Sequence, residues 1–76
     1  MDARGYEEGA DRAARLLSKS WMLARKGMDG EAAEAKEGAG EALRAIAPGK
    51  RERHEAAADV WHRALEMFDG MLRGGA

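Results

Sequence analysis

The stretch HEAAADVWHRALEMF, residues 54–68, begins with two residues of the zinc-protease motif H-E-x-x-H. In that motif, two histidines four residues apart lie on one helix face and bind the same zinc ion. Here Ala58 occupies the position of the second histidine, and His62 follows His54 by eight residues. Eight residues of helix rise about 12 Å, whereas zinc–nitrogen bonds are about 2.1 Å long. The spacing therefore excludes a zinc-protease site within this helix.

A second chemical pattern in the same stretch is the row Asp59, His62 and Glu66, spaced i, i+3 and i+7. Carboxylate–histidine rows of this kind bind metals in helical bundles when a facing helix supplies matching ligands. Both histidines of the chain belong to this one stretch, so only a second copy could complete such a site. The simpler interpretation is an exposed histidine between charged neighbours. We expect the chain to need no metal and no cofactor.

Other catalytic patterns are missing from the sequence. The serines, Ser18 and Ser20, are not part of a nucleophile elbow, and the chain has no cysteine, which excludes thiol catalysis and disulfides. The glycine-rich stretch GEAAEAKEGAG lacks the G-K-[ST] ending of a phosphate-binding loop. The sequence therefore predicts that the protein is not an enzyme.

Cations gather in residues 49–54, GKRERH, at the predicted start of the last helix. Lys50, Arg51 and Arg53 could contact phosphates there, beside the free backbone N–H groups of a helix N-terminus. Glu52 and Glu55 interrupt the cluster, and the formal net charge of the chain is −1. A nucleic-acid-associated regulator that uses these cations is therefore the alternative hypothesis, and nucleic acid is not the expected partner.

Two further sets of residues are candidates for binding a protein partner. Glutamates follow one side of the predicted middle helix, opposite its alanines: Glu31, Glu34, Glu37 and Glu41. They could meet a basic groove of another protein, or they could simply form the solvent face of a surface helix. Leu16, Met22 and Leu23 flank the apolar stripe of the first helix, and exposed apolar flanks often mark self-association or a partner.

The elements that position these residues are predicted to be helices, because alanine, the strongest helix former, is the commonest residue. Gly27 is typical of the residue that follows a helix, and Asp29 of the N-cap that begins the next one. Pro48 disfavours helix in the residue before it, and Gly49 permits a turn. Three helices are therefore expected, over residues 5–27, 30–47 and 51–73 of a single domain, 1–76.

Short loops between these helices favour a small all-α, three-helix bundle with up-down-up order. The alanine-rich middle helix buries little area, so the first and last helices are expected to form most of the core. The last helix has an uncharged face: Ala57, Val60, Trp61, Ala64, Leu65, Met67, Phe68, Met71 and Leu72. A domain of 76 residues buries only about 60% of its unfolded surface, and homodimerisation could complete the bundle.

Location and function follow from these observations as expectations. No apolar run reaches the roughly 20 residues of a membrane span, and the acidic N-terminus MDARGYEEGADR does not resemble a signal peptide, so a cytoplasmic location is expected. The favoured function is a non-catalytic module, a small inhibitor or adaptor that binds a larger protein. Its size and acidic helix fit an anti-CRISPR-type inhibitor from a phage or mobile element, although no motif points to that class.

Overall fold

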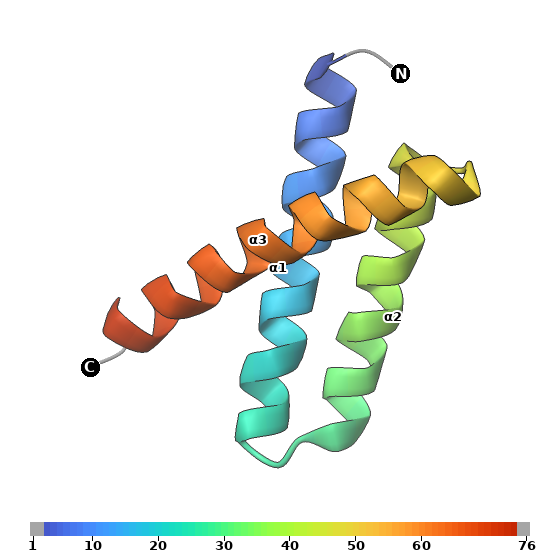
Figure 1. Cartoon of the computed structure of the whole chain (residues 1–76). Helices are drawn as coiled ribbons and strands as arrows, with labels where there is room; N and C mark the ends of the chain where they lie inside the picture. Colours follow the sequence, from blue (N-terminus) through green and yellow to red (C-terminus); the bar gives the residue numbers. More distant parts are fainter. Residues whose placement is uncertain (1–2, 75–76) are drawn as a thin grey trace.

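The computed structural model describes residues 3–74, which form three α-helices: α1 (Ala3–Arg25), α2 (Asp29–Ile46) and α3 (Lys50–Gly74) (Figure 1). The all-α fold predicted from the sequence is confirmed. Each helix begins and ends within about two residues of its predicted bounds, as is normal for helix ends.

The turn between α1 and α2 is built on Gly27, whose φ of 78° is in the left-handed region. The N–H of Gly27 donates to the carbonyl of Ala24, and the N–H of Met28 to that of Leu23, both at 3.0 Å. This is the Schellman pattern of a helix that ends in glycine. The prediction that Asp29 is the N-cap is wrong: Met28 holds that position, because the motif ends there and Asp29 is already helical.

The turn between α2 and α3 follows from Pro48. Ala47 before it is extended, with φ −144°, and its N–H donates to the carbonyl of Leu43. The guanidinium of Arg53 reaches back from α3 and donates to the carbonyl oxygens of Ala47 at 3.1 Å and Pro48 at 2.6 Å. Arg53 thus satisfies backbone acceptors that the end of α2 leaves without helical partners.

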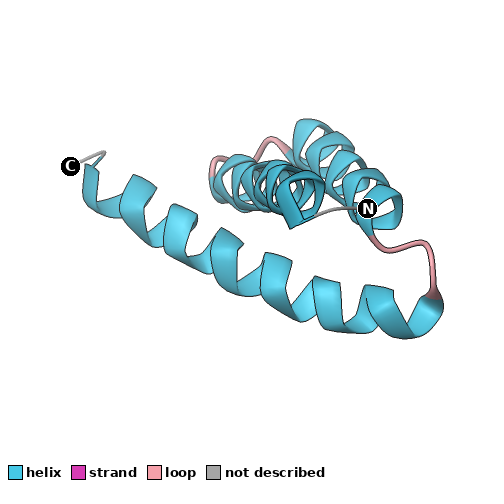
Figure 2. Ribbon diagram, turned by 90° about the horizontal axis from the view of Figure 1, so that it is seen from above, coloured by secondary structure: helices cyan, strands magenta, loops and turns pink. Residues whose placement is uncertain are grey.

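The arrangement of α3 departs from the predicted up-down-up order. The first two helices form an antiparallel hairpin, and α3 crosses one face of that hairpin obliquely instead of running alongside α2 (Figures 1 and 2). Its buried residues Val60 and Ala64 join α1 in one cluster. Because α2 has alanines at its buried positions, it packs closely against α1 and offers α3 few large side chains.

The centre of the core consists almost entirely of alanine. The buried cluster is Ala10, Ala13, Ala14, Val60 and Ala64. Larger side chains pack around it and stay partly exposed, among them Tyr6, Leu17, Trp21, Leu43, Ile46 and Met67. The cluster of buried residues thus joins α1 and α3, but the most extensive contact of α1 is with α2 and not with α3. The prediction that the first and last helices form most of the core therefore holds for the buried cluster alone, because the small buried residues of α2 let it pack closely against α1.

The molecule is thin. Its backbone extends over 37 × 24 × 16 Å, and a helix with side chains is about 10–12 Å across, so the fold is two helices thick. The second half of α3 extends beyond α1 in both views (Figures 1 and 2). Two surfaces of the fold are therefore left partly uncovered: the face of the hairpin opposite α3, and parts of the second half of α3.

Candidate protein-binding surfaces

The crossing of α3 over α1 is held by Arg63, whose side chain is 22% exposed. Its guanidinium contacts carboxylates of both helices: Glu7 at 2.9 and 3.0 Å, Asp11 at 2.9 Å and Asp59 at 3.0 and 3.2 Å. The hydroxyl of Tyr6 donates to Oδ2 of Asp59 at 2.6 Å, the same oxygen that accepts from Nη2 of Arg63. One arginine therefore links three carboxylates, and two of them come from α1.

The contacts within this cluster shift the pKa values of Asp59, Tyr6 and Arg63. The hydrogen bonds from Arg63, and then that from Tyr6, lower the pKa of Asp59 because both stabilise its charged form. The hydrogen bond to Asp59 and then partial burial raise the pKa of Tyr6, because the phenolate would lie against a carboxylate. The carboxylates of Glu7, Asp59 and Asp11 raise the pKa of Arg63. At neutral pH the arginine is charged, Asp59 is ionised and Tyr6 keeps its proton.

These shifts predict how stability depends on pH. The pKa of Asp59 in the folded chain is below its ordinary 3.8. The ionised carboxylate therefore contributes fully to the free energy of unfolding above pH 3.8, and this contribution is lost as the pH falls through the folded pKa. The pKa of Tyr6 is above its ordinary 10.0. The protonated hydroxyl therefore contributes fully to the free energy of unfolding below pH 10.0, and this contribution is lost as the pH rises through the folded pKa.

Urea unfolding across the pH range measures both effects. We expect Asp59→Asn to reduce the dependence of the free energy of unfolding on pH below about 4, and Tyr6→Phe to reduce it above about 10. Equal slopes for wild type and each variant would contradict the assigned hydrogen bonds. Glu66→Gln is the matched control, because Glu66 is an exposed carboxylate on the same helix without an ion pair in the described chain.

The row Asp59, His62 and Glu66 does not come together as a unit. Asp59 points to Arg63 and Tyr6, whereas His62 and Glu66 are exposed. Within residues 3–74, no three His, Asp or Glu side chains are placed so that they could hold a metal ion. The hydroxyls of Ser18 and Ser20 donate to the carbonyls of Arg15 and Leu17 within α1, so both have structural partners.

The predicted phosphate-binding cations are divided by the fold. Arg53 is bound to the carbonyls at the end of α2. Lys50 and Arg51 are exposed and line a shallow depression with His54 and Glu55. The hypothesis of a phosphate contact at this helix start thus retains two of its cations and stays a prediction.

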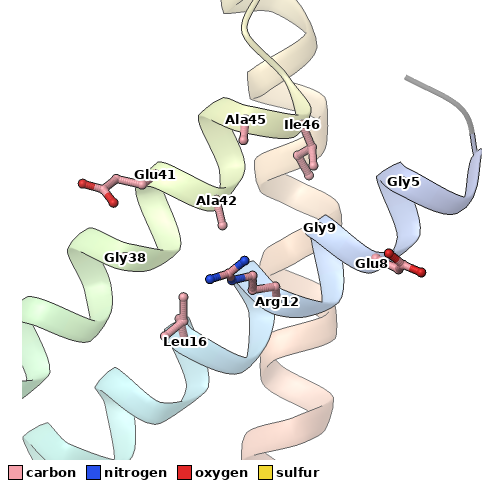
Figure 3. A pocket seen from close by; sticks show the side chains of 10 residues that line it. All are labelled: Gly5, Glu8, Gly9, Arg12, Leu16, Gly38, Glu41, Ala42, Ala45 and Ile46. Atoms are coloured by element: carbon pink, nitrogen blue, oxygen red, sulfur yellow. The ribbon is translucent and has the colours of Figure 1, made fainter.

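The hairpin carries a groove on the face opposite α3. One part of it, with a volume of about 530 Å³, is lined by the ten residues labelled in Figure 3, and no residue of α3 is among them. Gly9 and Gly38 are among the lining residues, and the side chain of Leu16 lies beside Gly38 (Figure 3). Leu16 also lines a second part, of about 480 Å³. We call the two parts together the hairpin groove.

The hairpin groove unites residues that the sequence predicted separately. Leu16 and Leu23 of α1 line it, together with three of the glutamates of α2: Glu31, Glu34 and Glu41. Glu37 is exposed but outside it. The acidic row and the leucines are therefore two sides of one surface, because α2 packs antiparallel beside α1.

Met22 lies on a different surface, near the ends of α1 and α3. It lines a depression with Arg25, Lys26, Met71 and Leu72. Nearby, the ring of Trp21 packs edge to face against Trp61 and Phe68, at centroid distances of 6.0 and 5.6 Å. Aromatic contacts thus attach the second half of α3 to α1.

The largest unforeseen feature is an apolar face on this half of α3. Trp61, Leu65, Met71 and Leu72 are between 38% and 52% exposed, although their position on the helix predicted that they belong to the core. We call these four residues the α3 apolar face. The helical pattern identified the side of α3 that packs against α1, but it could not show that the oblique crossing leaves these four side chains partly exposed.

No helix in the described part of the chain is both long enough and apolar enough to cross a membrane.

Comparison with known proteins found no matching family model, no matching curated protein and no matching solved structure.

Proposed function

We propose that this chain is a non-catalytic protein-binding module, acting as a small inhibitor or adaptor of a larger protein. The observation that carries the proposal is the α3 apolar face: four large, partly exposed apolar side chains along the second half of one helix of a thin domain. Contiguous exposed apolar residues mark interaction sites on small proteins, and tryptophan and methionine are enriched in the centres of interfaces.

The surroundings of this face indicate the chemistry of the partner. Arg25 and Lys26 line a depression together with Met71 and Leu72, and neither cation has an ion pair within the described residues. A partner segment with apolar anchors and neighbouring carboxylates fits this surface, because the apolar side chains provide affinity and the charges provide orientation. An amphipathic helix is the simplest segment with that pattern.

The proposal is tested by capture from an extract of the native host, followed by mass spectrometry. The immobilised wild-type chain is compared with the double variant Met71→Asp and Leu72→Asp, which changes exposed positions near the end of α3. We expect the wild type to retain a defined protein that the variant loses. The proposal is contradicted if every retained protein is retained equally by both chains.

A control separates loss of binding from loss of folding. The double variant Lys36→Glu and Glu37→Lys changes exposed positions on α2, away from the α3 apolar face, and leaves the net charge unchanged. This control should retain the partner as the wild type does. Circular dichroism of all three chains should show the same helix content.

A further inference from the structure

We propose that the hairpin groove is the interface of a homodimer, in which a second copy of this chain packs its own hairpin groove against the first. The groove follows the hairpin on the face opposite α3. Glycine and alanine are among the residues that line it, and Leu16 and Leu23 line it from α1. Small lining residues allow a second layer of helices to approach closely.

The charges along the groove identify its occupant. On the α1 side the groove has the cations Arg12 and Lys19, and on the α2 side it has glutamates. Arg12 lies at the same end of the groove as Glu41, and Lys19 lies at the end of Glu31 and Glu34. None of these five side chains makes an ion pair within the described chain. Glu8, the remaining charge on the α1 side, is paired with Arg4 at 3.4 Å.

A two-fold axis parallel to the hairpin makes these charges complementary. Such an axis places α1 of each copy over α2 of the other and keeps each residue at its position along the helices. Arg12 of each copy then meets Glu41 of the other, and Lys19 meets Glu34. An axis across the helices would instead place the α2 glutamates against each other, which repels. The charges therefore select one of the two face-to-face arrangements.

In the resulting dimer the two hairpins pack face to face as two layers of two helices, and both copies of α3 lie on the outside. Up-down hairpins that pair in this way form a four-helix bundle, and the second copy covers the hairpin face that a single chain leaves open. The α3 apolar face stays accessible in this dimer, so each dimer presents two such faces. This inference uses a different surface from the proposed function, and each can fail without the other.

Charge-reversal variants test the dimer. The first variant, Arg12→Glu with Lys19→Glu, makes the groove entirely acidic, and the second, Glu34→Lys with Glu41→Lys, makes it predominantly basic. Sedimentation equilibrium of the wild type should give twice the chain mass of 8.2 kDa. Each variant alone should dissociate at least about 100-fold more readily. An equimolar mixture of the two should again give twice the chain mass, as a heterodimer.

Several outcomes would overturn the inference. One is a wild type that remains monomeric at millimolar concentration. Another is a mixture of the two variants that fails to associate although each is folded. A third is dimerisation that survives both charge reversals and is abolished by Met71→Asp with Leu72→Asp, because the interface would then be the α3 apolar face.

Matched controls place the same charge changes outside the groove. Lys50→Glu with Arg51→Glu changes two exposed cations at the start of α3, and Glu37→Lys with Glu66→Lys changes two exposed carboxylates. Both controls should dimerise as the wild type does. Loss of the dimer in the controls would show that net charge, and not the order of charges in the groove, determines association, and it would also overturn the inference.

Discussion

Replacing Arg63 with alanine should lower the free energy of unfolding by about 2–3 kcal/mol, since three carboxylate contacts are lost together. The guanidinium bridges Glu7 and Asp11 of α1 to Asp59 of α3. Because these carboxylates are 36% to 59% exposed, water screens each pair and the effect per pair is modest. After the substitution, however, the carboxylates face one another without a cation, which adds repulsion at the helix crossing.

The expected loss is large for a domain of this size, whose total stability is about 4–11 kcal/mol by the usual scaling per residue. Urea unfolding followed by circular dichroism measures it. Arg63→Lys keeps the charge but not the planar group that contacts several carboxylates at once, so about half of the loss should remain.

The control is Arg73→Ala on the same helix. Among the described residues Arg73 pairs only with Asp69, one turn away, and their side chains are 80% and 57% exposed. Pairs of this kind contribute about 0.3–0.5 kcal/mol. If Arg63→Ala and Arg73→Ala had equal effects, Arg63 would not hold the crossing of α3 over α1.

Replacing Gly9 with alanine should destabilise the fold by about 1–3 kcal/mol, because a Cβ atom there would collide with the side chain of Ile46. Alanine is a better helix former than glycine by up to about 1 kcal/mol, so propensity alone predicts the opposite sign. Gly9 therefore marks a close approach of α1 to the end of α2. Thermal unfolding should show the difference as a lower Tm, by about 4–8 °C for each kcal/mol.

Gly70→Ala is the matched control, since a Cβ at Gly70 meets no atom within 4 Å and the residue lies inside the exposed part of α3. This variant should be more stable than the wild type by about 0.5–1 kcal/mol. Adding Ile46→Leu to Gly9→Ala should recover part of the lost stability, because leucine has no methyl group on Cβ. A Gly9→Ala chain as stable as Gly70→Ala would show that the helices can separate at no cost.

The helices could be predicted from the sequence because their signals are local. Gly27 and Pro48 fix the two breaks through their own backbone preferences, whatever the rest of the chain does. The N-cap was predicted one residue too late, since the Schellman motif at Gly27 also determines the conformation of Met28. The path of α3 was not predicted, because a helical pattern gives the direction of an apolar face but not the angle at which another helix crosses it.

The site residues were predicted as separate groups, and their relation came only from the fold. Leu16 and the glutamates of α2 were candidates on different helices, and the antiparallel hairpin brings them to one groove. Arg63 was missed, although a signal exists: Glu7 and Asp11 are four residues apart, as are Asp59 and Arg63. Such spacing places each pair on one helix face, but the convergence of the two faces depends on the crossing of α3.

The alanine core has a thermodynamic consequence. Alanine has no side-chain rotamers to lose on folding, and each buried alanine removes only a small apolar area from water. The heat capacity of unfolding depends on the apolar area that becomes exposed. Because Ala10, Ala13, Ala14 and Ala64 form the centre of the core, we expect this heat capacity to be lower than in most globular proteins, where it is about 12–15 cal/mol/K per residue. The free energy of unfolding should therefore vary unusually little with temperature. Cooling should raise it only slightly, and cold denaturation should occur only far below the freezing point of water.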